Sequence, residues 1–595
     1  MTVYAIDVES YPNFFMVAVM ENGGGARTLT LFPGEEVENR PRIKTWQRLL
    51  ESGDEIVTFN GSAYDLPMMA ALCAGWSVEK MNALSNDLIK RDLPPWKAMK
   101  GLRELKCNHI DLYWVTPLMA GLKQYGGRLH TRSLQDLPLD PTKPIDRSQK
   151  DLMTKYCLND CRITIEVYRQ LKSEIELREV MSKELDQDLR SCSDAQIGER
   201  VLVNLVGLKR KKRKGFKGGK IHYDVPMSID EDDPCLAEQI KHVAETAFIV
   251  TPSGGLKAPK EFNNVVRMGA MDYKMGVGGL HSTEKSIHHS ADESRLEAWD
   301  VTSYYPNIIL NEQFVPKQNP TRFLHEYGKL VKRRVAAKRA GDRATMDVLR
   351  IAINGSFGKF GSVWSPLFDP QLLLQVTMTG QLQLLMMISA LERHKGVEVV
   401  SANTDGLVVK FSKSRRLREA VDQEREDWEI QTGHNMEVEP ITALYARDVN
   451  NYVITKADGS VKRKGAFTDQ QSPKTILWKN PANEVSIEAA VEHLKTGRSV
   501  ESYVMECADV RKFLTLRTVR GGALYGDEQL GSVIRWHYSI DPPHECIRRA
   551  DSGAKVPRSE GARPMMQLAD ELPKDLDHDW YIMEANDVLR QLGAF

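Results

Sequence analysis

The sequence is poor in cysteine, and the spacing of its cysteines argues against a structural zinc site. Only eight of the 595 residues are cysteine, and none of them forms a Cys-x-x-Cys pair of the kind that binds zinc. The one close spacing, Cys157 to Cys161, fits a single turn of helix better than part of a metal site. We therefore expect reduced thiols and a cytoplasmic location.

The sequence also lacks an excess of charge of either sign. Lys and Arg together number 81, as do Asp and Glu, so net charge gives no steering toward nucleic acid. A nucleic-acid-binding protein of this composition has to concentrate its positive charge locally. One tract does so, at residues 209–214, and it begins with Lys209, Arg210, Lys211 and Lys212. We favour contact with phosphate for this tract, while a solvated loop and a localisation signal remain alternatives.

No hydrophobic run predicts a membrane span. The longest, Leu372 to Leu391, is interrupted by several glutamines, threonines and a glycine, so it predicts a buried helix. Near the start of the chain, Asp7 and Glu9 interrupt any signal-peptide core, and no leader is expected. No association with a membrane is expected either.

The length of the chain predicts roughly two to four domains, and its composition supplies enough apolar residues for sizeable cores. A helix is predicted from about Asp151 to Leu177 because apolar residues recur on one helical face. Beyond about residue 475 the pattern mixes helical and irregular stretches. Short apolar runs near the start predict strands at residues 3–8, 14–20 and 28–32.

Two acidic residues far apart in the chain each stand at the end of a strand-like run. Asp300 lies within such a run that begins at Leu296, and Asp405 follows a run that begins at Val397. Another strand-like run starts just after Gly406, so Asp405-Gly406 is predicted to form a tight hairpin turn. On neighbouring strands the two carboxylates would form a pair able to hold Mg²⁺ beside a phosphate.

A basic helical hairpin is predicted between these two acids, at residues 325–361, with a break at Gly341-Asp342. Arg334 and Lys338 are four residues apart and share one face of the first helix. Arg350 lies on the second helix, ahead of Asn354 and Phe357, which offer a polar and a stacking surface. Three cations converging from antiparallel helices suit a triphosphate, although a basic helix face taken alone is more often simply solvated.

Taken together, these segments resemble three motifs of the family B DNA polymerases. Asp300-x-x-Ser-x-Tyr305-Pro resembles motif A, Arg350-x-x-x-Asn354-Gly-x-Phe-Gly resembles motif B, and Thr404-Asp405 resembles the centre of motif C. The chain departs from the usual pattern by having Arg350 in place of a lysine and Asn403 in place of the first motif C aspartate. Arginine keeps the positive charge but not the ammonium geometry, and Asn403 implies weaker metal binding.

The N-terminal part resembles the three exonuclease motifs of proofreading polymerases, in the same order along the chain. They are Asp7-Val-Glu9, the segment from Asn60 to Asp65, and Tyr156-Cys-Leu-Asn-Asp160. By this resemblance the acids Asp7, Glu9, Asp65 and Asp160 would bind two metal ions that flank a scissile phosphodiester. Tyr156, one helical turn from Asp160, would orient the attacking water.

The resemblance implies a mixed α/β and α+β multidomain fold, with an RNase H-like 3′–5′ exonuclease domain followed by a right-hand polymerase. The expected parts are an exonuclease domain at 1–180, a basic linker at 181–220, the palm at 221–324 and 362–475, a fingers hairpin at 325–361, and a thumb at 476–595.

The resemblance also implies roles for side chains in polymerisation. Asp300 and Asp405 would hold two Mg²⁺ ions, with Mn²⁺ as the alternative metal, and Lys464 would contact DNA. Tyr305 would pack against the sugar and exclude a ribose 2′-hydroxyl. The other side chains expected to contact the incoming dNTP are Arg334, Lys338, Arg350 and Asn354.

The implied function is template-directed extension of a primer 3′ end with proofreading, by a monomer. The exonuclease motifs begin already at Asp7, and this compactness is typical of phage and plasmid enzymes, which would act in the host cytoplasm. The short intervals between the polymerase motifs imply extension from an ordinary primer and not from a terminal protein. Primer–template DNA and dNTPs are the expected partners, with a helicase or single-strand-binding protein in addition. Two alternatives remain: a dedicated 3′–5′ exonuclease with a vestigial polymerase half, which Asn403 would favour, and a non-catalytic single-strand-binding module built on the basic tract.

Overall fold

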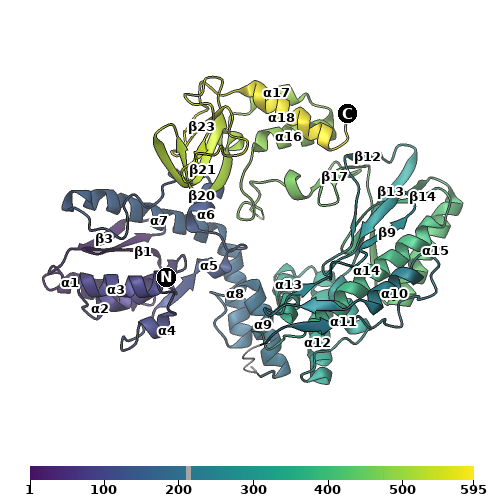
Figure 1. Ribbon diagram of the computed structural model, residues 1–595, viewed down its shortest axis with the longest axis horizontal. Helices are drawn as coiled ribbons and strands as arrows, with labels where there is room; N and C mark the ends of the chain where they lie inside the picture. Colours follow the sequence, from purple (N-terminus) through teal and green to yellow (C-terminus); the bar gives the residue numbers. More distant parts are fainter. Residues whose placement is uncertain (210–215, 474) are drawn as a thin grey trace. The chain divides into compact units, whose positions relative to one another are not determined.

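The computed structural model describes residues 1–595 apart from 210–215 and 474. The contacts within the chain divide it into two compact units, each built from helices and sheets (Figure 1). The first unit comprises Met1–Ser193, Asp469–Ser486 and Tyr503–Ile582, and the second comprises Asp194–Thr468, Ile487–Ser502 and Met583–Phe595. The fold class is therefore mixed α/β with more than one domain. The finer boundaries between exonuclease, palm, fingers and thumb stay a prediction.

The first unit is organised around a mixed sheet with strand order β3-β2-β1-β4-β5. The first three strands are antiparallel, and β4 and β5 run parallel to β1. This confirms the three strands predicted near the start of the chain. The strands are β1 (Val3–Tyr11), β2 (Phe14–Glu21), β3 (Ala26–Leu31), β4 (Glu55–Thr58) and β5 (Asn108–Asp111).

Both faces of this sheet are covered, because successive side chains of a strand point to opposite faces. In β2, Phe15 and Val17 belong to the core shared with α1 to α3, while Phe14 and Met16 belong to the core shared with α7. Figure 1 shows β1 and β3 between α7 and the helices α1 to α3. The helices are α1 (Arg40–Leu50), α2 (Asp65–Cys73), α3 (Val78–Ile89), α4 (Pro95–Ala98), α5 (Leu112–Val115), α6 (Leu122–Arg128) and α7 (Lys150–Gln170).

The helix predicted over 151–177 is broken in the structure. Helix α7 ends at Gln170, and α8 (Lys172–Leu185) begins after a tight turn at Leu171, whose N–H bonds to the carbonyls of both Val167 and Tyr168. Leu171 and Ile175 are buried in the same core as α7. The buried stripe therefore continues through the break, which is why the apolar period alone predicts one helix.

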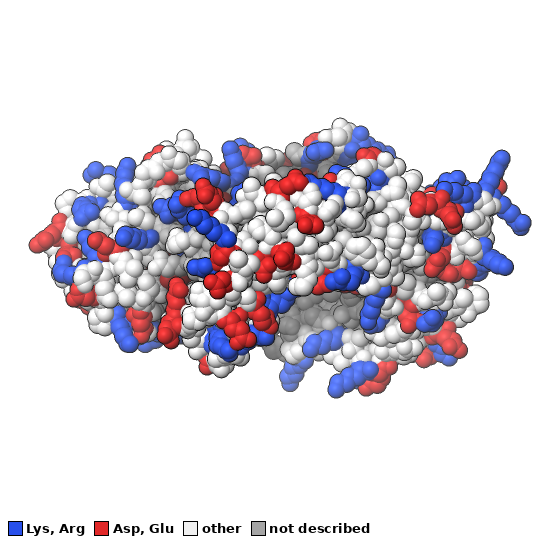
Figure 2. All heavy atoms as spheres, turned by 90° about the horizontal axis from the view of Figure 1, so that it is seen from above, with Lys and Arg blue, Asp and Glu red and all other residues white. Residues whose placement is uncertain are grey.

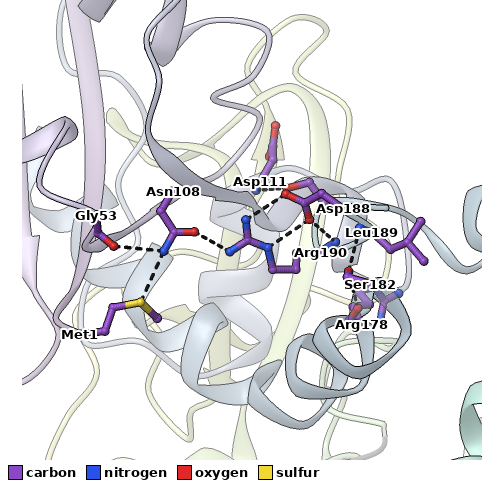
Figure 3. A network of polar contacts seen from close by, with 10 residues as sticks. Met1, Gly53, Asn108, Asp111, Arg178, Ser182, Asp188, Leu189 and Arg190 are labelled. Atoms are coloured by element: carbon purple, nitrogen blue, oxygen red, sulfur yellow. Dashed lines mark hydrogen bonds and ion pairs between the residues drawn. The ribbon is translucent and has the colours of Figure 1, made fainter. Parts of the chain in front are cut away.

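The segment after α8 is fastened to the edge of the sheet at β5 (Figure 3). Arg190 pairs with Asp188 and donates to the side-chain oxygen of Asn108 on β5 at 2.5 Å. The buried guanidinium of Arg178 donates to the carbonyl of Cys192 at 2.9 Å. The sequence predicts a linker at 181–220, but residues up to Ser193 thus belong to the first unit, and Asp194 begins helix α9 (Asp194–Val206) of the second.

A second sheet completes the first unit, with strand order β22-β20-β21-β23. The fully buried Arg535 of β21 donates hydrogen bonds to the carbonyls of Thr131, Arg132 and Met565, and so ties this sheet to the N-terminal part. Two eleven-residue strands here contradict the mixture of helical and irregular stretches predicted beyond 475. The strands are β20 (Thr515–Tyr525), β21 (Glu528–Tyr538), β22 (Arg548–Arg549) and β23 (Ala562–Pro564).

The second unit is centred on a sheet with strand order β16-β13-β15-β14-β11-β10-β9. The strand-like runs that contain Asp300 and flank Asp405 are confirmed as β13, β14 and β15. The strands are β9 (Val265–Met268), β10 (Met271–Lys274), β11 (His281–Ser282), β13 (Ser294–Val301), β14 (Val397–Asn403), β15 (Gly406–Ser412) and β16 (Met436–Pro440).

Helix α14 (Pro370–Glu392) forms the core behind this sheet, with α10 (Ala237–Glu245), α11 (Tyr304–Asn311) and α15 (Arg415–Thr432). Of the helices in the described part of the chain, α14 is long and apolar enough to cross a membrane, but 94% of its most apolar window is buried inside the protein. The prediction of a buried helix at 372–391 is therefore confirmed.

The predicted helical hairpin is confirmed as α12 (Pro320–Ala340) and α13 (Arg343–Phe357), joined at Gly341, whose φ of 70° suits glycine. Helix α9 packs closely against α13. A Cβ at Gly198 would lie 2.3 Å from the main-chain nitrogen of Ser356, so the two helices approach through glycine.

Two smaller sheets and three helices account for the remaining elements. One sheet has the order β12-β17-β18-β19 and the other β6-β7-β8. A boundary between the two units falls within each of the helices α16, α17 and α18. The elements are β6 (Gly219–Ile221), β7 (Phe248–Val250), β8 (Leu256–Lys257), β12 (Ile287–Ser290), β17 (Ala443–Asp448), β18 (Asn451–Thr455), β19 (Val461–Arg463), α16 (Glu484–Thr496), α17 (Val500–Glu506) and α18 (His578–Gln591).

Candidate active sites

The first unit brings four predicted acids together around strand β1. Asp7 and Glu9 are two residues apart on β1 and so point to the same side. Asp160 reaches them from α7, and carboxylate oxygens of these three residues all lie within 4.8 Å of one another. Asp65 is the first residue of α2 and is close enough to Asp7 for the two carboxylates to repel each other electrostatically.

The protonation of this acid cluster reflects burial and mutual repulsion. Burial, followed by the charge of Asp160, raises the pKa of Asp7 to about 7. Burial and the neighbouring carboxylates hold the pKa of Glu9 and of Asp65 well above the ordinary value. Such a cluster is short of positive charge, and a divalent cation would favour its ionised form. The donor set, all carboxylate oxygen, suits Mg²⁺.

Lys123 of α6 is a member of this site that the motifs do not include. Its ammonium group forms an ion pair with Asp160 and lies 4.2 Å from the centroid of the Tyr156 ring. Burial raises the pKa of Asp160, and the charge of Lys123 opposes that rise. The hydroxyl of Tyr156 also opposes the rise in the pKa of Asp160. A single lysine with no local pattern gives the sequence no signal for this role.

Asp111, at the end of β5, fixes the loop that leads to Asp65. Its buried carboxylate accepts hydrogen bonds from the main-chain N–H groups of Asn60 and Ser62, at 2.8 and 3.0 Å, and from Tyr113 at 3.2 Å. Asn60 has a φ of 66°, so the loop turns sharply at this point. A strand followed by an aspartate is the only sequence signal for Asp111, and many structural residues share it.

The two cysteines spaced by four residues lie on α7, as the spacing predicts. The buried thiol of Cys157 donates to a carboxylate oxygen of Asp7 at 3.1 Å. This hydrogen bond to Asp7 accounts for Cys157 without a role as a metal ligand.

In the second unit the two acids that were predicted to form a carboxylate pair lie near the tip of a hairpin. Asp300 of β13 lies directly opposite Gly406 of β15. A Cβ at Gly406 would lie 2.5 Å from Asp300 Oδ1 and 2.7 Å from the carbonyl oxygen of Trp299, so the register of the sheet needs glycine here. Burial, followed by the charge of Asp300, raises the pKa of Asp405. The two carboxylates are therefore electrostatic neighbours, as the sequence predicts.

The hairpin turn is shifted by one residue from its predicted place. Gly406 pairs with Asn403, so the turn consists of Thr404 and Asp405. Thr404 has a φ of 53°, which is unfavourable for a β-branched residue. Its side chain occupies the space that a Cβ at Gly279 would fill, at 2.3 Å. Strained backbone of this kind is frequent at functional sites.

Two lysines lie close to these acids: Lys462 of β19 and Lys464, the residue that follows this strand. The Nζ atom of Lys462 lies 3.5 Å from Asp300 Oδ2, and the charge of Lys464 opposes the rise in the pKa of Asp405. Lys464 Nζ also lies 5.7 Å from the centroid of the Tyr452 ring. Lys464 is one of the predicted DNA contacts, whereas Lys462 is not. A Lys-x-Lys spacing by itself does not distinguish Lys462 from ordinary charged residues.

A cavity of about 270 Å³ opens beside Asp405. Arg334 of α12 reaches it and donates to Ser303 Oγ at 2.9 Å. Burial, together with the charge of Arg350, lowers the pKa of Arg334. The Tyr305 ring packs on Phe357 with centroids 4.9 Å apart. The residues lining the cavity include Ser303, Tyr305, Tyr327, Arg334, Asn354, Phe357, Thr404 and Asp405.

Other predicted site residues do not line this cavity. Lys338 pairs with Glu437 at 2.5 Å, and Glu437 is the cross-strand neighbour of Asp300 on β16. Arg350 pairs with Asp347 at 3.4 Å. Asn403 donates its amide to the carbonyl of Val449 at 2.9 Å.

Little of the basic tract can be placed in a site. Lys209 is exposed, and Arg210, Lys211 and Lys212 lie outside the described residues. On the face of the molecule drawn in Figure 2, cationic and anionic side chains are interspersed. This agrees with the equal numbers of basic and acidic residues in the sequence.

No family model and no curated protein matches the chain. Among solved structures, the chain is similar to the family B DNA polymerase from the hyperthermophilic archaeon Pyrobaculum calidifontis. The similarity covers 100% of this chain and 78% of that one, at 16% sequence identity and a TM-score of 0.40.

Proposed function

We propose that the chain is a template-directed DNA polymerase that extends a primer 3′ end with dNTPs and removes mispaired ends with a 3′–5′ exonuclease. The observation that carries the proposal is the cavity of the second unit, which combines Asp405 with Arg334, Asn354 and Tyr305. Asp300 lies on the neighbouring strand. An acid pair beside a cation and a stacked aromatic wall is the set of groups that a metal-bound nucleotide requires.

The acids of both sites fit divalent metal ions, two per site, with Mg²⁺ as the first choice and Mn²⁺ as the alternative. Asp300 and Asp405 would hold them in the second unit. In the first unit Asp7, Glu9, Asp65 and Asp160 would do so. When bound, such ions activate a hydroxyl or water nucleophile and offset charge on the phosphate under attack.

In polymerisation the side chains of the second unit would bind and orient the substrates. Arg334 would neutralise the nucleotide phosphates, with Lys338 and Arg350 moving to join it when a triphosphate binds. Tyr305, supported by Phe357, would face the sugar and leave no room for a 2′-hydroxyl, and Asn354 would border the base pair. Lys462 and Lys464 would exchange their contacts with the two acids for the backbone of the primer.

In the exonuclease reaction Tyr156 would orient the attacking water. Lys123, which touches both Tyr156 and Asp160, would hold these groups in place and offset the charge that develops on the phosphate. Asp111 is a positioning residue, because it acts through the loop that carries Asp65.

We assign the first unit's N-terminal sheet and helices to an RNase H-like exonuclease domain and the second unit's large sheet to the palm. Helices α12 and α13 would be the fingers, and residues 476–595 would contain the thumb. The setting we propose is phage-type genome replication by a monomer in the host cytoplasm. Its partners would be primer–template DNA, dNTPs, and a helicase or single-strand-binding protein.

Primer extension with Mg²⁺, in the presence and absence of dNTPs, tests the proposal. We expect the wild type to lengthen the primer with dNTPs and to shorten it without them. Asp405→Asn should lose extension and keep shortening, and the double variant Asp7→Ala/Glu9→Ala should do the reverse.

Two other results would overturn the proposal. A dedicated exonuclease with a vestigial polymerase half would give no extension even with Asp7→Ala/Glu9→Ala. A non-catalytic single-strand-binding module would show neither reaction in any variant.

A further inference from the structure

A short segment far along the chain is built into the wall of the exonuclease-type domain. Residues 469–486 belong to the first unit. The buried guanidinium of Arg128, at the end of α6, donates to the carbonyl of Leu477 at 2.5 Å and to the side chain of Asn480 at 2.9 Å. Leu477 itself is buried in the core that includes Tyr156 and Cys157 of α7. The backbone on both sides of residue 478 is therefore fixed.

The same contacts place this segment beside the acid cluster. Gln124 of α6 donates to Asn480 at 3.1 Å. Its neighbour in the chain, Lys123, forms the ion pair with Asp160, and neighbouring Cα atoms are only about 3.8 Å apart. One turn of α6 thus contacts the acid cluster with one residue and the 477–480 segment with the next.

Trp478 stands in the middle of this anchored segment with 55% of its surface exposed. Its main chain is held by a hydrogen bond from its N–H to the carbonyl of Thr475 at 2.8 Å. The residues that follow it, Lys479 and Asn480, are polar, and its apolar neighbour Leu477 is buried in the core, so the ring is the exposed apolar surface of this segment. A protein partner would need a much larger apolar patch, whereas one exposed ring on a rigid segment suits a single base.

We propose that Trp478 is a stacking platform for an unpaired base of the DNA strand whose 3′ end occupies the acid cluster. The inference deepens the exonuclease half of the proposed function and rests on it. A base of any identity can stack on an indole ring, because every base has a π face. Sequence-independent binding is what removal of an arbitrary mispaired end requires, and the rigid anchoring keeps the entropic cost of ordering the platform low.

Binding of an oligothymidylate, measured by fluorescence anisotropy without divalent metal, tests the platform directly. Trp478→Ala should weaken binding roughly 5- to 150-fold, the range measured for one lost base stack. Degradation of the same strand with Mg²⁺ should show a higher KM at nearly unchanged kcat, and Trp478→Phe should recover most of the affinity. A probe strand carrying 2-aminopurine at successive positions from its 3′ end would identify the stacked base, whose fluorescence is quenched by the wild type and recovers with Trp478→Ala.

Trp96→Ala is the matched control. Trp96 is also an exposed tryptophan of the first unit, at 74%, and is also followed by a lysine, but it lies on α4. This variant should bind and degrade the strand as the wild type does.

Two results would overturn the inference, and they are distinguishable. If the wild type degrades single strands and Trp478→Ala binds and degrades them equally well, the platform is wrong and the exonuclease stands. If the wild type degrades no single strand with Mg²⁺, the proposed exonuclease fails and the platform fails with it.

Discussion

The two acid sites differ in how much of each is already assembled. In the first unit three carboxylates lie within 4.8 Å of one another, and the Lys123–Asp160 pair has side chains only 17% and 7% exposed. In the second unit the side chains of the Lys462–Asp300 pair are 42% and 59% exposed, and a cavity opens beside Asp405. Under the proposed function, the first site would need only metal and a strand end. The second would be completed by a nucleotide and template, and its cations now contact acids that would then face the substrate.

The largest effect is expected from Gly406→Ala, which tests whether the sheet register sets the acid pair. The added Cβ would lie 2.5 Å from Asp300 Oδ1, and displacement of a catalytic group by about 1 Å can cost about 100-fold. We expect primer extension to fall by at least about that factor while single-strand degradation is unchanged. Gly276→Ala, with nothing within 4 Å of the new Cβ, is the control. Equal extension rates for the two variants would show that the pair does not depend on this register.

Lys123→Met tests the built-in cation of the first site. The variant keeps the length of the side chain and removes its charge next to Asp160. We expect kcat for degradation of a single strand to fall about 10- to 100-fold, because a fixed charge at the reacting phosphate is lost. Primer extension measured on the same preparation should stay within about twofold. The control is Lys155→Met, at a lysine on α7 of the same domain, and it should leave both rates unchanged. If the control loses as much activity as Lys123→Met, the proposed role of Lys123 is wrong.

Asp111→Ala tests whether the first site is held by its loop. Removing this carboxylate leaves three main-chain N–H groups without their acceptor, at a cost of about 1–3 kcal/mol for each group left buried and unsatisfied. We expect a lower Tm by calorimetry and a roughly tenfold loss of exonuclease activity at temperatures where the protein is folded. An unchanged Tm would mean that water replaces the carboxylate and that the loop holds its own shape.

The smallest effect is expected from Lys338→Ala, which tests whether Lys338 contributes to nucleotide binding in the second unit. Its pair with Glu437 is more than half exposed on both sides, and such pairs contribute about 0–1 kcal/mol to stability. We expect the Tm to change little and the KM for dNTPs to rise several-fold, because a phosphate contact is lost. If KM is unchanged, Lys338 serves only its pair with Glu437.

The sequence predicts those features that follow from local pattern. Strands with period-two burial and helices with an apolar face were predictable, and so was the meeting of Asp300 with Asp405, because both stand at strand ends. Lys123, Asp111 and Lys462 act through contacts between distant segments, and no local pattern distinguishes them from ordinary charged residues. The strand pair β20–β21 escaped prediction because Gly521 and Gly522, both with positive φ, interrupt its alternation and shift its register.

The glycine opposite Asp300 also has a consequence for how the protein responds to heat. Asp300 pairs with Gly406, and the N–H of Val301 bonds to the carbonyl of Asp405, so main-chain hydrogen bonds along β13 and β15 hold the two acids. We expect the spacing of the acids to persist as long as these bonds do. Nucleotide addition should therefore be lost on warming in one cooperative step with the melting of the large sheet, without a preceding gradual decline.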